Sequence, residues 1–132
     1  MSNLSEEFFQ VTNVSKGGII IAQRVALAER SEVRRTGLLG KNSLHPDEGI
    51  YLVPCEWLHT FGMRFSIDVA FISNKGLVLA VHHGLKPKRL SKIVLRAEGA
   101  LELSPGRLRS TNTEKGDTVR FLDIPSLYKQ TL

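Results

Sequence analysis

The feature that most constrains the fold is a series of short apolar segments separated by strong turn signals. Residues 67–72 and 77–82 are rich in apolar and β-branched side chains and flank the sequence Ser73-Asn-Lys-Gly76. Because glycine adopts positive φ at no steric cost, such a sequence closes a tight turn between two strands. Residues 9–14 and 19–27 flank a Lys-Gly-Gly turn in the same way. Both pairs predict antiparallel hairpins.

Three further strands complete the predicted set of seven. Residues 50–53 form an apolar run that ends at Pro54, which cannot donate a hydrogen bond to a strand ladder. Residues 93–103 predict another strand, with Gly99 as a candidate bulge. Residues 118–122 predict the last strand.

Two segments carry helical signals. Ser31 is a suitable N-cap for a short helix over residues 31–39, and Gly40 is suited to end it. Ser104-Pro105 resembles the start of a second short helix or turn that extends to about Ser110. Strands and helices do not alternate regularly. The sequence therefore predicts an α+β fold that is mostly β: a curved, largely antiparallel sheet or partly closed barrel with one or two short helices. The first helix is expected to cover one opening.

The chain has 132 residues, which suits one domain with enough buried surface to fold without metals or disulfides. We expect a flexible N-terminus over residues 1–8 and a single globular domain over residues 9–124. We expect a tail over residues 125–132.

Location is predicted from three features. The one cysteine, Cys55, cannot form an intramolecular disulfide, which suits a reducing compartment. The first residues lack the basic start and apolar run of a signal peptide. Purely apolar runs such as residues 19–22 are far shorter than the about 20 residues that a membrane-spanning helix needs. We therefore expect a cytoplasmic protein with no membrane partner.

Four sequence elements resemble those of one protein family, called domain of unknown function 192. Residues 35–40, Arg-Thr-Gly-Leu-Leu-Gly, are similar to its arginine- and glycine-containing element. Residues 59–72 resemble its main signature, in which a methionine-rich turn precedes an aspartate-containing strand. Residues 100–106, Ala-Leu-Glu-Leu-Ser-Pro-Gly, and the pair Gly116-Asp117 resemble its last two elements.

The resemblance implies a compact β-rich fold with a small helix. It implies no activity, because no reaction or ligand is established for the family as a whole. The chain departs from the family at Ser66, where proline is usual, and this loosens the turn before Ile67 but leaves Asp68 in place.

The segment from Cys55 to Asp68 concentrates the side chains that could recognise a ligand. Aromatic, sulfur and charged groups lie close together there. Irregular segments beside a curved sheet often line a binding cleft. We predict a binding module for a small molecule or a protein, with a cleft bounded by residues 59–68 and the helix that carries Arg34 and Arg35. The candidate ligand-binding residues are Trp57, His59, Met63, Asp68 and Arg35.

An enzyme is the first alternative. Cys55 and His59 could form a nucleophile and base, with Asp68 orienting the imidazole, or Asp68 could act by itself. The structural interpretation is a small core thiol, a hydrogen-bonded histidine and a turn-capping carboxylate. The histidines lack metal-ligand spacing, and adjacent His82 and His83 on a strand would face opposite sides. We predict no metal and no cofactor.

A nucleic-acid adaptor is the second alternative. The formal net charge is +5, and residues 82–89 begin a basic stretch. Phosphates would suit such charges, but no aromatic residue is interleaved there for base stacking. A solvated loop is the favoured interpretation. The sequence thus leaves the function open among these three classes.

Overall fold

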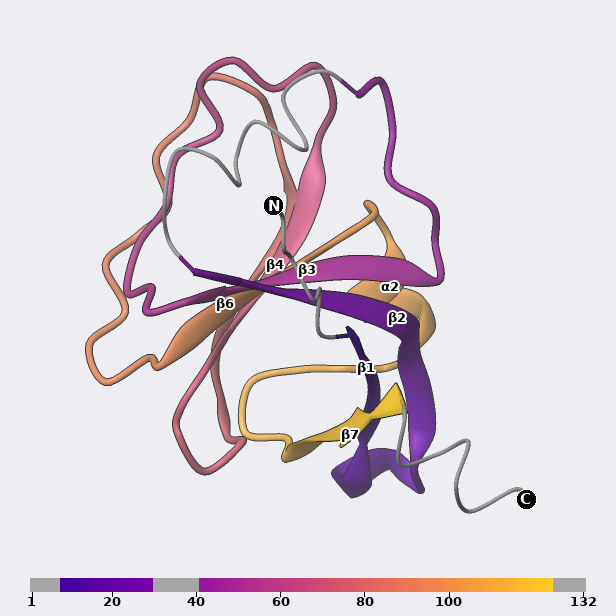
Figure 1. The fold of residues 1–132 in the computed structure, drawn as a ribbon. Coiled ribbons are helices and arrows are strands. Elements are labelled where there is room, and N and C mark those ends of the chain that lie inside the picture. The colour runs from indigo at the N-terminus through magenta and orange to yellow at the C-terminus, as the bar shows by residue number, and fades with distance from the viewer. Residues whose placement is uncertain (1–7, 30–40, 125–132) are drawn as a thin grey trace, which may run out of the picture.

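The computed structural model describes residues 8–29 and 41–124, and these form one curved sheet with a small helix (Figure 1). The strands have the following bounds: β1 (Phe8–Asn13), β2 (Ile19–Glu29), β3 (Glu48–Val53), β4 (Ile67–Ile72), β5 (Val78–Leu85), β6 (Gly99–Leu103) and β7 (Val119–Asp123). A 3₁₀ turn, η1 (Val14–Lys16), joins β1 to β2, and helix α2 (Arg107–Ser110) lies between β6 and β7. The mostly-β prediction is confirmed. The predicted 31–39 helix lies outside the described residues.

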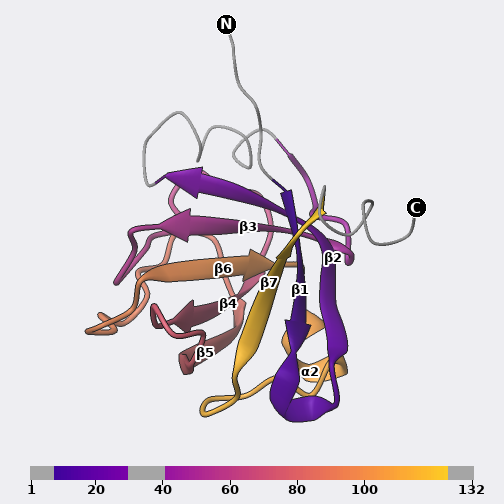
Figure 2. The ribbon, with the colours of Figure 1, turned by 60° about the horizontal axis from the view of Figure 1, so that its bottom comes forward.

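The strands form a seven-stranded sheet in the order β5-β4-β6-β3-β2-β1-β7. Every neighbouring pair is antiparallel except β2 and β3, which are parallel. Strand β2 is long and bends, so that residues 19–26 pair with β1 while residues 24–29 pair with β3. Figure 2 shows the result: β1 and β7 cross the direction of the other strands steeply. The predicted curved, largely antiparallel sheet is therefore confirmed.

The two edge strands meet at one end of the sheet. Leu77 and Thr118 form an isolated antiparallel bridge. Next to it, the Val78 N–H donates to the Asp117 carbonyl at 2.8 Å, and the Gly116 N–H donates to the Val78 carbonyl at 2.9 Å. These bonds satisfy backbone groups that an open edge would leave to solvent. The sheet is thus a half-barrel that closes at this end.

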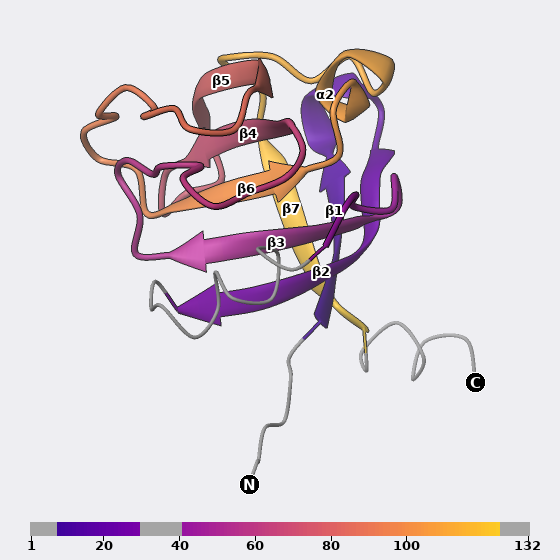
Figure 3. The ribbon, with the colours of Figure 1, turned by 90° about the horizontal axis from the view of Figure 1, so that it is seen from above.

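Apolar side chains pack on both faces of the sheet. Strand β4 shows this most clearly, because Ala70 and Ile72 belong to a first core, whereas Val69 and Phe71 belong to a second. The first core also holds side chains of β1, β2, β7 and α2: Val11, Ile21, Ala22, Val25, Val119 and Leu108. The second core includes residues of two irregular segments: Cys55, Leu58, Met63 and Ala97, with Val94 packed against it. Those segments cover the sheet face that β1 and β7 leave uncovered (Figure 3).

Both predicted hairpins are confirmed, but the strand predicted over residues 93–103 is wrong in its first half. Strand β6 begins only at Gly99, and Gly99 is a regular pairing residue opposite Ile72 rather than a bulge. Glycine is needed there for a different reason. A Cβ at this position would lie 2.6 Å from the ring of Tyr51, so that ring occupies the space of the missing side chain.

The predicted helix near Ser110 is confirmed, with a later start. Helix α2 begins at Arg107, and its N-cap is Gly106 with φ 90°, not Ser104. Glycine suits this left-handed conformation because it has no Cβ. Because glycine has no side chain, Gly106 itself cannot form a side-chain hydrogen bond to the first turn. The carboxylate that does so comes from β4, as described below.

A buried carboxylate holds the closed end of the half-barrel together. Asp117 Oδ2 accepts hydrogen bonds from Asn13 Nδ2 at 2.9 Å, Lys16 Nζ at 2.9 Å and the Glu114 N–H at 3.1 Å. Burial by itself would raise the pKa of Asp117. The hydrogen bonds from Asn13, Lys16 and the Glu114 backbone, with the charge of Lys16, outweigh burial and lower that pKa below 3.8.

This network predicts an acid-dependent loss of stability. A carboxylate whose folded pKa is depressed stabilises the fold fully above its unfolded pKa, and the contribution is lost as pH falls through the folded value. We expect the free energy of unfolding to fall as pH drops below about 4, and to fall less steeply in Asp117→Asn. Urea unfolding from pH 7 to pH 2.5 measures this. Asp123→Asn, which changes an exposed carboxylate, is the control. A slope in Asp117→Asn equal to that of the control would contradict the prediction.

Candidate functional site

The most distinctive local structure is formed by residues 54–66 and 86–98, which we call the paired loops. They run side by side and are joined mainly through their backbones, although only His59 and Leu90 form a β-bridge. The hydrogen bonds between them are Cys55 N to Glu98 O (3.0 Å), Val94 N to Glu56 O (2.7 Å), Ser91 N to Leu58 O (2.9 Å), Thr60 N to Arg89 O (2.9 Å) and Lys88 N to Thr60 O (3.1 Å). The paired loops therefore form an irregular ribbon whose inner side chains cover the second core.

Thr60 is the centre of this ribbon. It is fully buried, and its hydroxyl donates to the Lys86 carbonyl at 2.6 Å and accepts from the Arg89 N–H at 2.9 Å. Its main chain bonds to the same loop, as described above. Sequence reasoning missed Thr60, because a single threonine between His59 and Phe61 matches no motif. The partners that give it its role are about 26 to 29 positions away in the chain.

Two other polar side chains complete the ribbon. Ser91 Oγ accepts from the Leu58 N–H at 2.9 Å, and Glu56 Oε2 accepts from the Arg96 N–H at 2.9 Å. These two contacts give backbone donors partners along an otherwise irregular path. Sequence reasoning did not single out either residue.

Three of the predicted ligand-binding residues lie in the first of the paired loops. Met63 is buried in the second core, whereas Trp57 is 37% exposed. His59 is half-buried, its Nδ1 accepts from the Phe61 N–H at 3.2 Å, and its ring lies 5.3 Å from that of Phe61. Arg35 lies outside the described residues.

The structure separates the fifth predicted residue, Asp68, from those three. Asp68 is fully buried on the α2 side of β4, opposite the face that the paired loops cover. Its Oδ1 accepts from the Gly84 N–H at 2.8 Å, and its Oδ2 accepts from the N–H groups of Gly106 at 3.1 Å and Leu108 at 3.0 Å. This geometry ties the end of β5 and the first turn of α2 to the central strand. It matches the turn-capping interpretation of Asp68.

Cys55 occupies a structural environment as well. It is 1% exposed and packs in the second core, and its Sγ donates to the Trp57 carbonyl at 3.2 Å. A reactive thiolate needs an accessible, electropositive site. The buried position and the carbonyl contact suit a core thiol instead.

The histidines of β5 differ in their environments. His82 is half-buried, with its ring 6.2 Å from that of Phe71, whereas His83 is exposed. Burial first, and then the nearby charges of Lys92 and His83, lower the pKa of His82, which favours its neutral form at pH 7. Within residues 8–29 and 41–124, no three His, Cys, Asp or Glu side chains are grouped so that they could hold a metal ion.

The outer side of the paired loops is unusually apolar. Leu90 is 61% exposed, Ile93 is 68% exposed and Leu95 is 72% exposed. These are the most exposed large hydrophobic side chains in the described part of the chain, and they lie within six consecutive positions. Phe61 and Trp57 of the first loop are also exposed. Scattered exposed apolar residues are normal, whereas a group of them is typical of interaction surfaces.

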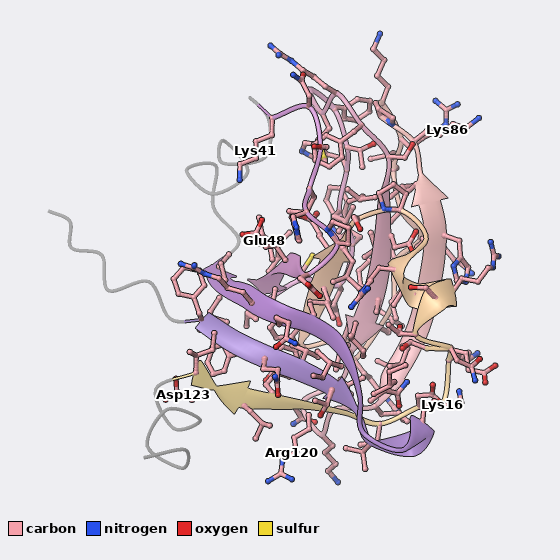
Figure 4. All side chains as sticks on the ribbon, turned by 90° about the vertical axis from the view of Figure 1, so that its right-hand side faces the viewer. Lys16, Lys41, Glu48, Lys86, Arg120 and Asp123 are labelled. Carbon is pink, nitrogen blue, oxygen red and sulfur yellow. The ribbon has the colours of Figure 1, made fainter. Side chains whose placement is uncertain are left out.

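The paired loops are also strongly basic. The ribbon carries two acidic residues, Glu56 and Glu98, and six cationic ones: Arg64, Lys86, Lys88, Arg89, Lys92 and Arg96. All eight are exposed. Figure 4 shows Lys86 at one end of the molecule, with Lys16 and Arg120 at the other. A local positive potential is therefore expected over the paired loops.

Two of these cations are held in an unfavourable backbone conformation. Lys88 has φ 63° and Arg96 has φ 72°. The left-handed region costs an L-residue with a Cβ roughly 1–2 kcal/mol, and glycine avoids that cost. The third described non-glycine residue with positive φ is Asn112, a type that tolerates this conformation. Strain of this kind is concentrated at functional sites.

The model of the family called domain of unknown function 192, described as an uncharacterised ACR, matches residues 11–121. This range spans β1 to β7 and both paired loops. The chain belongs to this family. The family membership that the four sequence elements predicted is therefore confirmed. None of the curated proteins matches the chain.

Two solved structures share the fold of this member of domain of unknown function 192. One is a protein from Sinorhizobium meliloti 1021, provisionally described as a transcription regulator; it has 21% identity and a TM-score of 0.74, with 91% of this chain and 98% of that chain covered. The other is a protein of unknown function from Novosphingobium aromaticivorans DSM 12444; it has 19% identity and a TM-score of 0.70, with 91% and 88% covered. At these identities the likeness shows the fold alone.

The role of Asp68 leads to a stability prediction. In Asp68→Asn, the side-chain amide keeps one acceptor oxygen. Its NH₂ group replaces the other oxygen, so a donor then faces N–H donors that had an acceptor in the wild type. We expect a loss of about 2–3 kcal/mol in the free energy of unfolding, measured with urea. Asp47→Asn is the matched control, because Asp47 also contacts α2, through Arg107 at 3.2 Å, but is half-exposed. An exposed pair contributes about 1 kcal/mol or less. Equal losses in the two variants would contradict the assigned role.

The strained cations lead to a prediction of opposite sign. We expect Lys88→Gly and Arg96→Gly each to raise the free energy of unfolding by up to about 1 kcal/mol, because glycine relieves the left-handed strain. Lys92→Gly is the control, because Lys92 lies in the same loop but does not have a positive φ. It should lower the free energy of unfolding by about 0.5–1 kcal/mol. Thermal or urea unfolding compares the three. Destabilisation of all three variants alike would show that no strain is stored at Lys88 and Arg96.

Proposed function

We propose that this protein is a small binding module, and that the paired loops are its recognition surface for an anionic partner. The observation that carries the proposal is the combination of the most exposed apolar side chains of the described chain with six exposed cations on one ribbon. Apolar area supplies binding free energy, and complementary charge supplies steering and orientation. We propose this surface in place of the cleft that the sequence predicted near His59–Asp68.

The strained cations support the proposal independently of exposure. Glycine at positions 88 and 96 would favour the observed backbone, yet the chain carries Lys88 and Arg96 there. A basic side chain kept at a conformational cost is expected where its charge contacts a partner.

The enzyme alternative receives less support. Cys55 is buried against a backbone carbonyl, and Asp68 accepts three backbone hydrogen bonds on the other side of the sheet. Each contact gives its residue a structural role that needs no reaction.

Nucleic acid is a second candidate partner for a specific reason. The basic loop has no aromatic residues of its own, but its pairing with residues 54–66 brings Trp57 and Phe61 to the same ribbon. The description of the Sinorhizobium meliloti protein as a transcription regulator is a further reason to include DNA in the test. We also propose a cytoplasmic location, supported by the single buried cysteine.

The test compares two triple charge reversals. One is Lys88→Glu with Arg89→Glu and Lys92→Glu on the paired loops; the control is Lys75→Glu with Lys115→Glu and Arg120→Glu at the far end. Each reversal removes two positive charge units, so both triples take the formal net charge from +5 to −1. Equilibrium binding is measured against four anionic ligands: single-stranded DNA, duplex DNA, a polyglutamate peptide and phosphatidylglycerol vesicles.

The proposal predicts that the wild type binds at least one of the four ligands. The loop triple should bind at least about tenfold more weakly, while the control triple changes by less than about threefold. Circular dichroism confirms that both triples are folded. Equal losses in the two triples would show that only net charge matters, and absence of binding to all four ligands would also overturn the proposal.

A further inference from the structure

We infer that the paired loops dock on an anionic lipid bilayer, with Leu90, Ile93 and Leu95 entering the interfacial layer. This inference rests on the proposed function and names the partner of the same surface. A bilayer that carries anionic lipids offers both components that the surface lacks: an apolar layer for the exposed side chains and a negative layer for the surrounding cations.

The chemistry of the exposed side chains favours a bilayer over nucleic acid. The three most exposed ones are aliphatic, and the two aromatic ones are less exposed. Binding to single-stranded nucleic acid depends on aromatic rings that stack on bases, which leucine and isoleucine cannot do. Aliphatic side chains instead gain free energy when they leave water for a lipid phase.

The three lysines among the cations suit a bilayer. Three of the six cations are lysines: Lys86, Lys88 and Lys92. Lysine is depleted at protein–protein interfaces. At a membrane surface, in contrast, its long aliphatic stem lies along the apolar layer while the ammonium group reaches the lipid phosphates.

The backbone of the paired loops suits an environment with little water. Paired N–H groups lower the cost of moving a loop into the interfacial layer, because unpaired backbone donors lose hydrogen bonds to water there. Six N–H groups of the second loop already have partners within the ribbon: those of Lys88, Arg89, Ser91, Val94, Arg96 and Ala97. The apolar tips can therefore enter the interface without exposing these donors.

This inference revises the expectation that the protein has no membrane partner. That expectation rested on the short length of the apolar runs, which concerns spanning helices. Within the described residues, no helix is long and apolar enough to cross a membrane. Leu90, Ile93 and Leu95 act as separate interfacial anchors, which a search for long apolar runs does not detect.

The chain provides its own reporter for the experiment. Trp57 is the one tryptophan, and it lies on the paired loops. The full-length protein is mixed with vesicles of phosphatidylglycerol and phosphatidylcholine, with pure phosphatidylcholine vesicles and with DNA. Bound fractions are measured by co-sedimentation, and tryptophan fluorescence is recorded with vesicles whose acyl chains are brominated.

Two double variants separate apolar insertion from charge. Leu90→Asn with Ile93→Asn removes two apolar side chains from the paired loops. The control, Val14→Asn with Ile19→Asn, removes two exposed apolar side chains, 53% and 41% exposed, at the far end of the molecule. Neither pair changes the net charge, and circular dichroism confirms that both are folded.

The expected result is binding to the anionic vesicles at least about tenfold tighter than to phosphatidylcholine. Brominated chains should quench Trp57. The Leu90/Ile93 pair should bind at least about tenfold more weakly, and the control pair should change by less than about threefold. Binding to DNA but not to vesicles would overturn the bilayer inference and leave the proposed function standing. Vesicle binding without quenching, or with no loss in the Leu90/Ile93 pair, would overturn the insertion of the loops.

Discussion

Strand β4 carries buried side chains on both of its faces, and this constraint decides where the other parts of the molecule lie. On one face, the bent strand β2 brings β1 and β7 around to enclose the first core, and α2 adds Leu108. The other face needs a cover too, because Val69 and Phe71 are fully buried there. No described strand packs over them, so irregular chain supplies the cover. The paired loops owe their position to this requirement, and their outward side chains are exposed because the ribbon is only one layer thick.

A cover made of loops must provide hydrogen-bond partners for its own backbone groups, because it has no strand ladder to provide them. Thr60, Ser91 and Glu56 perform this task with side-chain hydrogen bonds to the neighbouring loop. The ribbon is consequently held in one shape without a hydrophobic core of its own. A surface ordered in advance loses less conformational entropy when a partner binds. The same contacts that protect the second core therefore also order the outer surface that we propose for recognition.

The sequence predicted those parts of the fold that depend on neighbouring residues. Both hairpins were recoverable because each turn and its strands are adjacent in the chain. The segment 93–98 was misassigned to a strand on its apolar residues. Ile93 and Leu95 are in fact exposed, and the Val94 N–H donates to the Glu56 carbonyl of the other loop rather than to a strand. The proposed surface could not be predicted either, because the sequence analysis weighed the aromatic segment and the basic stretch separately, and only the fold pairs these two loops. Asp68 was recognised as a candidate, but the donors that define its role come from Gly84, Gly106 and Leu108.

The paired loops also show where stability and recognition have different requirements. At Lys88 and Arg96 the backbone favours glycine, while a charged surface favours a basic side chain, and the chain carries the basic side chain at both places. Proteins tolerate such local strain when the rest of the fold determines the conformation. Here the hydrogen bonds from the Lys88 N–H to Thr60 and from the Arg96 N–H to Glu56 hold the strained residues in place. Both strained residues are therefore held by residues that also join the two loops, Lys88 by the Thr60 carbonyl and Arg96 by the Glu56 carboxylate, which links the architecture of the cover directly to the charge it presents.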